Sequence, residues 1–216
     1  MSRRIPLRAA ILLLLLCIAI PVGWAIRSKR QQVHHDQSYT AKRSAMVQAN
    51  AAIAPPQDFV ALGDSLTEQV YLADVCGRSF NAGVGGARVA DVAVMADRIL
   101  KRLQPKVILV AVGTNDFWTG MDVATFRTQY AALLARLPRA HIILMGLPES
   151  AEGTATIREM AKARGFTYVD PVTGPGNTVD DGAHLKSPGA RLYRQRIAAA
   201  CAAVQPPSPR PVQPAI

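Results

Sequence analysis

Ser65 stands where a short apolar run ends, in the sequence Gly63-Asp64-Ser65-Leu66. Glycine, aspartate and serine are common turn residues, so this stretch by itself predicts only the end of a strand. A serine hydroxyl at such a point becomes a nucleophile when a neighbouring base removes its proton. Ser65 is therefore a candidate nucleophile if the chain also supplies a base and hydrogen-bond donors for a negatively charged oxygen.

His184 is the candidate base, because histidine changes its protonation state near neutral pH and so suits general-base catalysis. Asp181 lies three residues before it and could orient the ring through a hydrogen bond to the second ring nitrogen. The adjacent Asp180 could do the same. His141 begins an expected strand at the opposite edge of the sheet. The residues alone thus indicate a base and leave two aspartates open as its partner.

The elements that must position these residues can be read from hydropathy. Five strand-like runs occur, at 58–62, 79–83, 106–112, 141–147 and 166–170. Longer amphipathic stretches separate or follow them, at 87–103, 122–137, 155–165 and 187–204. The third and fourth runs are continuously apolar, as strands buried on both faces are. The alternation predicts an α/β fold with a five-stranded parallel sheet covered by helices on both faces.

Polar or glycine-rich clusters follow four of these runs. They read GDSL (63–66), NAGVGG (81–86), GTND (113–116) and DDGAHL (180–185). Ligands of an open parallel sheet bind beyond the carboxyl ends of its strands, so we expect the clusters to meet at one edge. Turn chemistry explains any one of them, but it does not predict a nucleophile, a base and an amide donor together.

Together the four clusters resemble the SGNH or GDSL hydrolases, and the resemblance covers residues 57–204. It implies a flavodoxin-like three-layer α/β/α sandwich and a serine esterase mechanism. The G-x-S-x-G turn of the other common serine hydrolases is absent, since Thr67 stands where its second glycine would be.

The resemblance also implies a role for each site residue. Ser65 would be the nucleophile and His184 the base, with Asp181 rather than Asp180 orienting the ring. The oxyanion hole would consist of the backbone N–H groups of Ser65 and Gly83 and the side-chain amide of Asn115.

Substrate contacts are harder to read from the sequence. Three further residues are candidates for substrate binding: Asp64, Asp116 and Trp118. Phe117 and Trp118 would line an acyl or leaving-group pocket or simply pack at a helix start. Specificity is expected in the loops 116–122, 148–154 and 171–180. No metal or organic cofactor is implied, because the glycines lack the full dinucleotide-binding pattern and no Walker lysine motif occurs.

Residues 1–26 are expected to be a signal peptide or a membrane anchor. Between Arg8 and Arg27 lie 18 uncharged residues, which is the lower limit for a helix that crosses a bilayer. The run is longer than the apolar part of a usual signal peptide, which favours an anchor, although cleavage after Ala25 fits as well. Cys17 fits an apolar cysteine better than a lipidation site, because the preceding Leu16 is bulky.

The remaining flanks are polar or proline-rich. Residues 27–56 are expected to be a polar stalk that Pro55 and Pro56 end, and residues 205–216 a disordered tail. The His-His-Asp stretch that begins at His34 has no further metal ligand nearby, so it indicates a solvated linker.

The net charge of +10 is concentrated outside the expected domain. Residues 1–56 carry eight Lys or Arg side chains against Asp36 alone. This position indicates a membrane surface rather than nucleic acid as the partner. The expected location is the cell membrane, with the domain in the periplasm or outside the cell, or secretion if the segment is cleaved. An even pair of cysteines in such a domain, Cys76 and Cys201, forms either a disulfide or two buried thiols.

The expected function is that of an extracytoplasmic serine esterase. It would hydrolyse small acyl or acetyl esters through an acyl-enzyme. The substrate would be a small ester, an acylated carbohydrate or a lipid. An acyltransferase that moves O-acetyl groups to or from envelope carbohydrate would use the same site. A non-catalytic envelope binding protein on this scaffold is the third alternative. The sequence does not indicate the oligomeric state.

Overall fold

The computed structural model describes the backbone of residues 7–204. In the first helix it describes side chains only at 17, 20–25, 27–28 and from 37 onward. The start of the expected anchor (1–6) and the proline-rich tail (205–216) lie outside the described residues, as do the side chains of the His-His-Asp stretch at 34–36.

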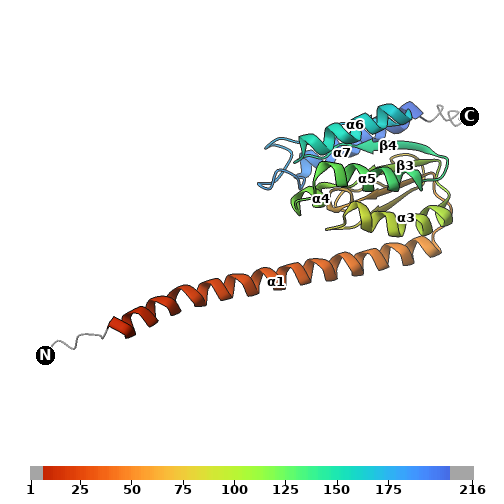
Figure 1. Cartoon of the computed structure of the whole chain (residues 1–216). Helices are drawn as coiled ribbons and strands as arrows, with labels where there is room; N and C mark the ends of the chain where they lie inside the picture. Colours follow the sequence, from red (N-terminus) through yellow and green to blue (C-terminus); the bar gives the residue numbers. More distant parts are fainter. Residues whose placement is uncertain (1–6, 205–216) are drawn as a thin grey trace, which may run out of the picture.

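One parallel sheet forms the centre of the molecule (Figure 1). Its strands are β1 (Phe59–Gly63), β2 (Ser79–Gly83), β3 (Val107–Ala111), β4 (His141–Met145) and β5 (Thr167–Val169). They lie in the order β2-β1-β3-β4-β5, which is the order of flavodoxin-like sheets. The predicted five-stranded parallel α/β sandwich is confirmed.

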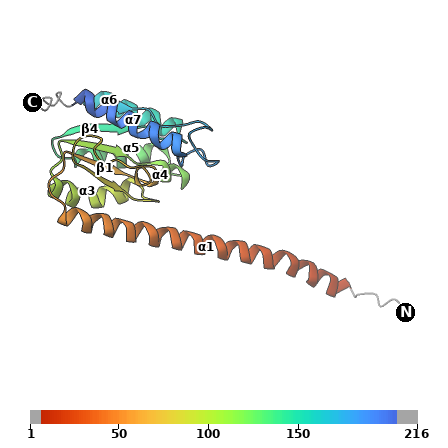
Figure 2. The same ribbon diagram turned by 180° about the vertical axis from the view of Figure 1, so that it is seen from behind.

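Helices cover both faces of the sheet, as expected (Figure 2). One face carries α3 (Val89–Leu103), α5 (Val123–Ala135) and α6 (Ala151–Arg164), and the other carries α7 (Ser187–Val204). Two short helices, α2 (Ser65–Glu68) and α4 (Thr114–Trp118), follow β1 and β3 directly. Because they occupy the carboxyl ends of neighbouring strands, they position residues at the edge where ligands bind.

Strand alternation divides the core in two. In β1, Val60 and Leu62 pack with the helices of the first face, whereas Phe59 and Ala61 pack towards α7. All four side chains are fully buried. Burial of a large apolar side chain contributes about 1.5–3 kcal/mol, so this strand is held firmly between the layers. The fixed strand in turn fixes the residues that follow it.

Cys76 and Cys201 form a disulfide, with their Cα atoms 5.8 Å apart. The bond joins the loop after α2 to the last turns of α7. It therefore connects the segment that carries Ser65 to the helix that follows His184.

The N-terminal helix α1 (Leu7–Ile53) runs along the domain and beyond it (Figures 1 and 2). Its last turns pack beside α3, and Val47 and Ala51 are buried in the core of that face. It ends just before Pro55, where a helix is expected to stop. Residues 27–53 thus continue one helix, and the end of this expected stalk is packed on the domain. Among the residues included in the search, no helix is both long and apolar enough to cross a membrane.

Candidate active site

Ser65 is the first residue of α2, directly after the turn that ends β1. Asp64 caps this helix, because its side chain accepts a hydrogen bond of 3.0 Å from the N–H of Leu66. Gly63 makes the turn possible: a Cβ there would overlap the Thr67 side chain and the carbonyl oxygen of Ala111. The sharp change from strand to helix leaves the serine at the carboxyl edge of the sheet.

The structure brings together Ser65, His184 and Asp181. The Ser65 Oγ lies 2.9 Å from Nε2 of His184, although the two residues are 119 positions apart. The other ring nitrogen, Nδ1, lies 2.6 Å from Oδ2 of Asp181. Asp181 is thus the carboxylate that contacts the ring. The three groups form a continuous hydrogen-bonded line from carboxylate to hydroxyl.

The carboxylate of Asp181 is itself fixed by the backbone. Its Oδ1 accepts hydrogen bonds of 2.9 Å from the N–H groups of both Ala183 and His184. Burial by itself would raise the pKa of Asp181, but these bonds and the bond to the His184 ring outweigh it, so the pKa lies below its ordinary value. An ionised Asp181 accepts a hydrogen bond from the Nδ1–H group, which keeps the ring proton on Nδ1 and leaves Nε2 free to accept the Ser65 proton.

Gly83, the expected backbone donor, is not available for an oxyanion in this structure. Its N–H donates a hydrogen bond of 2.8 Å to Oδ1 of Asn81. A Cβ at Gly83 would overlap the backbone of Thr67 and Glu68, so the residue is packed against α2. The single N–H proton of Gly83 is therefore already used within the protein.

Gly86, three residues further on, has the properties expected of that donor. Within residues 7–204 no acceptor contacts its N–H, and its φ of +74° turns the backbone in a way that favours glycine. Gly86 lines the same cavity as Asn115. The sequence signal was present, as a further glycine in the run 81–86, but the choice between glycines depends on hydrogen bonding.

The other two expected donors remain usable. Ser65 is the first residue of α2, and its backbone N–H has no hydrogen-bond acceptor within the described residues. The Asn115 side chain donates one hydrogen bond of 3.0 Å to the carbonyl oxygen of Ala87. Its amide carries two hydrogens, so one is left for a ligand.

Asp64 and Asp116, two of the weaker substrate candidates, are buried beneath the site. Asp64 is 1% exposed and Asp116 is fully buried. Burial raises the pKa of each to about 6. The Asp116 carboxylate accepts a hydrogen bond of 3.1 Å from the N–H of Val89 at the start of α3. Both side chains thus brace backbone turns and neither is open to a substrate in this structure.

Trp118 lies at the open side of the site. It is 47% exposed, and its ring centroid is 5.9 Å from that of His184. The preceding Phe117 instead packs on Phe126, with ring centroids 4.8 Å apart. Of the two aromatic residues that follow the GTND cluster, only Trp118 is therefore available to line a substrate pocket.

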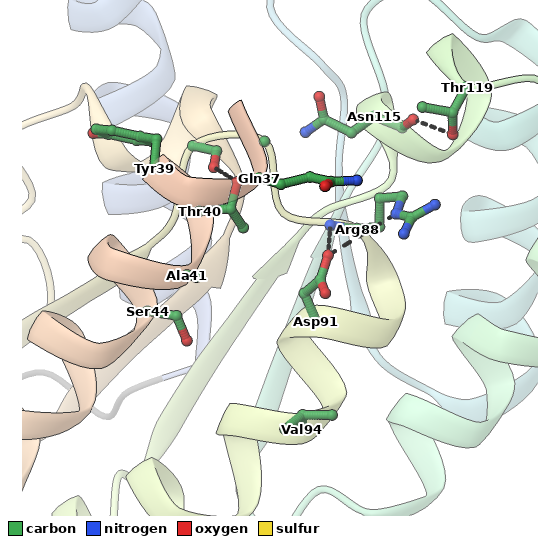
Figure 3. Close-up of a pocket in the computed structure, with 12 residues that line it drawn as sticks. Gln37, Tyr39, Thr40, Ala41, Ser44, Arg88, Asp91, Val94, Asn115 and Thr119 are labelled. Atoms are coloured by element: carbon green, nitrogen blue, oxygen red, sulfur yellow. Dashed lines mark hydrogen bonds and ion pairs between the residues drawn. The ribbon is translucent and has the colours of Figure 1, made fainter. Parts of the chain in front are cut away.

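A cavity of about 730 Å³ opens on the Asn115 side of the site (Figure 3). This volume is in the usual range for small-molecule sites. One wall consists of Gly85, Gly86 and the start of α3. The opposite wall consists of five residues of α1, namely Gln37, Tyr39, Thr40, Ala41 and Ser44. The sequence indicated a stalk for that segment, so this wall was not expected.

Comparison with known proteins agrees with the geometry. Residues 61–205 match the GDSL-like lipase/acylhydrolase family. A search of curated proteins found no matching sequence.

Solved structures share the fold at low sequence identity. A proposed platelet activating factor from Streptococcus pneumonia has a TM-score of 0.66 at 16% identity, over 82% of this chain and 99% of that one. A GDSL-like lipase from Bacteroides thetaiotaomicron has a TM-score of 0.62 at 18% identity, over 77% and 100%. The acetyl xylan esterase AlAXEase has a TM-score of 0.56 at 20% identity, over 68% and 99%. The expected family is confirmed: the chain belongs to the GDSL-like lipase/acylhydrolase family of ester hydrolases.

Proposed function

We propose that this hydrolase is an extracytoplasmic serine esterase that cleaves small acyl or acetyl esters through an acyl-enzyme. The observation that carries the proposal is the line of hydrogen bonds from Asp181 through His184 to Ser65, with the hydroxyl 2.9 Å from the ring nitrogen. A hydroxyl in that position loses its proton to the ring as it attacks a carbonyl carbon.

The reaction has two halves that use the same groups. His184 Nε2 takes the Ser65 proton while Oγ bonds to the ester carbon, and the imidazolium then gives that proton to the leaving alcohol. The acyl group remains on Ser65. A water molecule then attacks the acyl-enzyme, with His184 again as base, and releases the acid and the free serine.

Three donors would stabilise the oxyanion of each tetrahedral intermediate. They are the N–H groups of Ser65 and Gly86 and the second hydrogen of the Asn115 amide. Gly86 takes the role expected of Gly83 because the Gly83 proton is donated to Asn81. Loss of one such donor typically costs about 2.7–4 kcal/mol of transition-state stabilisation.

An O-acetyl group on a carbohydrate is the substrate that we favour. A structural relative is an acetyl xylan esterase, and Trp118 offers an exposed aromatic face next to His184. Aromatic faces suit the apolar faces of sugar rings as well as other apolar groups.

Two features support a location outside the cytoplasm. The Cys76–Cys201 disulfide is typical of oxidising compartments. The basic residues that flank the apolar N-terminal segment suit a membrane surface.

Hydrolysis of 4-nitrophenyl acetate by the full chain tests the proposed function. We expect Ser65→Ala to lose at least about a thousandfold in kcat/KM, since the nucleophile is removed. Ser79→Ala is the matched control, because Ser79 begins β2 at the opposite end of the sheet. Equal rates for the wild type and Ser65→Ala would exclude a serine esterase.

An acyltransferase is the second candidate, favoured by the cavity next to Asn115, which could hold an acceptor alcohol. Incubation with an acetyl donor and a sugar acceptor separates the two: free acetate indicates hydrolysis and acetylated sugar indicates transfer. A non-catalytic binding role is disfavoured by the intact hydrogen-bonded line at Ser65.

A further inference from the structure

The cavity beside the oxyanion donors is lined by two parts of the chain, one inside and one outside the residues matched to the hydrolase family. Gly86, Asn115 and Thr119 belong to the part that matches the hydrolase family, residues 61–205. The facing wall, residues 37–44, belongs to α1 and lies before that match. The cavity therefore has one wall that lies outside the residues matched to the hydrolase family.

Side-chain bonds hold α1 against the turn that follows β2. Arg43 Nε lies 2.9 Å from Oε1 of Glu68 and donates a hydrogen bond of 3.2 Å to the carbonyl oxygen of Gly83. Tyr39 donates a hydrogen bond of 2.7 Å to the same Glu68 oxygen. Thr40 Oγ1 donates one of 2.7 Å to the carbonyl oxygen of Gly85. Four polar contacts within one stretch of helix make the wall a fixed part of the site.

The lining of the cavity is rich in hydrogen-bonding side chains. Gln37 points from α1 towards Arg88 and Asn115 across the cavity (Figure 3). The Gln37 amide makes no hydrogen bond to any described residue, and the Arg88 side chain is half exposed, with its Nε 4.0 Å from Asp91. The amides of Gln37 and Asn115 and the guanidinium of Arg88 therefore face the same cavity and have hydrogen-bond donors available for a ligand.

These donors decide which part of an ester fits. Pockets for long acyl chains are lined mainly by large apolar side chains, whereas the apolar groups among the described lining residues are the side chains of Val94 and Ala41 and the ring of Tyr39. A chain of methylene groups would leave the amides of Gln37 and Asn115 without partners, which costs binding energy. A hydroxylated group would pair with them.

We propose that this cavity binds a sugar portion of the substrate, with the lining residues of α1 (Gln37, Tyr39, Thr40, Ala41 and Ser44) as one wall. The assignment rests on the proposed esterase function and deepens it. It makes α1 a determinant of specificity for carbohydrate esters, and the short ester 4-nitrophenyl acetate would not fill the cavity.

Two substrates and two variants of the full chain test the assignment. The substrates are 4-nitrophenyl acetate and O-acetylated cellotriose. Ala41→Phe fills the cavity from an exposed helix position, and we expect a loss of about tenfold in kcat/KM for the saccharide. Gln37→Ala removes one donor, and we expect a rise of about fivefold in KM for the saccharide. Each effect should exceed that on 4-nitrophenyl acetate.

Lys42→Ala is the matched control, since Lys42 is exposed on the same helix and does not line the cavity. If Ser65→Ala is inactive on both esters while Ala41→Phe and Gln37→Ala behave like Lys42→Ala, the sugar site is overturned and the esterase function stands. If Ser65→Ala keeps wild-type rates, the esterase function fails, and this assignment fails with it.

Binding measured without turnover provides a second readout. Cellotriose titrated into the Ser65→Ala variant should shift the backbone NMR signals of Gln37, Arg88 and Asn115. Shifts that are absent at millimolar cellotriose, or confined to the far face of the sheet, would contradict the assignment even where activity data agree with it.

Discussion

Ser65 can lose its proton to His184 only when the ring proton sits on Nδ1. Asp181 fixes that tautomer through its bond of 2.6 Å to Nδ1. Asp181→Asn would keep the shape of the site but favour the wrong tautomer. We expect a loss of about a thousandfold or more in kcat on 4-nitrophenyl acetate. Asp180→Asn is the control, because Asp180 does not contact the ring; an equal loss in that variant would contradict the role of Asp181.

The buried carboxyl group of Asp116 makes stability depend on pH. Burial raises its pKa from 3.8 to about 6, so the folded state holds this proton more tightly than the unfolded state does. Between about pH 4 and 6, this group therefore makes the protein less stable as pH rises. A shift of roughly two pKa units corresponds to about 3 kcal/mol.

The Asp116→Asn variant should lack this pH-dependent contribution to the free energy of unfolding. We expect the free energy of unfolding in urea to fall less between pH 4 and 6.5 in this variant than in the wild type. Asp64, whose pKa is raised in the same way, keeps its own contribution in both proteins. Parallel pH curves for the wild type and Asp116→Asn would show that the carboxyl group is not protonated in the folded state.

At the scale of elements, Glu68 connects three segments. It ends α2, the helix that begins with Ser65, and its carboxylate accepts from Tyr39 and Arg43 of α1 and from the N–H of Gly85. Its side chain is only 19% exposed, so these charge-assisted bonds are weakly screened by solvent. Glu68 is therefore a positioning residue for the turn that contains Gly86.

Glu68→Gln should loosen that turn without removing a group that contacts the substrate. We expect kcat on 4-nitrophenyl acetate to fall about three- to tenfold and KM to change less. The reason is that the neutral amide of the introduced glutamine forms weaker hydrogen bonds to Tyr39 and Arg43 of α1 than the carboxylate does. Glu159→Gln is the control, since it removes an exposed ion pair with Arg127 on the helical face. A change in KM alone would indicate that Glu68 does not act through the oxyanion turn.

The elements of the domain could be predicted because their hydropathy patterns are strong. Continuous apolar runs gave β3 and β4, and a parallel sheet then required the residues after its strands to meet at one edge. That requirement is why Ser65 and His184 were expected together although 119 residues separate them. The topology, rather than any single motif, made this part of the site predictable.

Two features could not be predicted, for physical reasons. Gly83 and Gly86 stand in the same glycine-rich run 81–86, and what distinguishes them as donors is the bond from Gly83 to Asn81 and the place of Gly86 on the cavity. The packing of α1 rests on Val47 and Ala51, small apolar residues in a polar, alanine-rich stretch with little amphipathic pattern. The choice of oxyanion donor and the packing of α1 both depend on three-dimensional contacts that the residue types alone do not indicate.

At the scale of the whole molecule, the site lies where the strand order reverses. The chain moves from β1 outward to β2 and then crosses back to β3, so the carboxyl ends of β1 and β3 lie side by side. Ser65 follows the first and Asn115 the second, and His184 lies in the loop between β5 and α7. The hydrogen bonds from Asp181 to Ser65 thus join α2 to the loop before α7, and their geometry depends on how firmly these two segments are held together.

The Cys76–Cys201 disulfide is the covalent part of that connection. It closes a loop of 125 residues that contains the whole sheet beyond β1, and such bonds typically contribute about 2–5 kcal/mol. We expect Cys76→Ser with Cys201→Ser to lower the free energy of unfolding in urea by that amount, and dithiothreitol to do the same to the wild type. Cys17→Ser is the control, because Cys17 is free and exposed on α1. A double variant as stable as the control would mean that packing of α7 on the sheet, rather than the disulfide, holds these two segments of the site together.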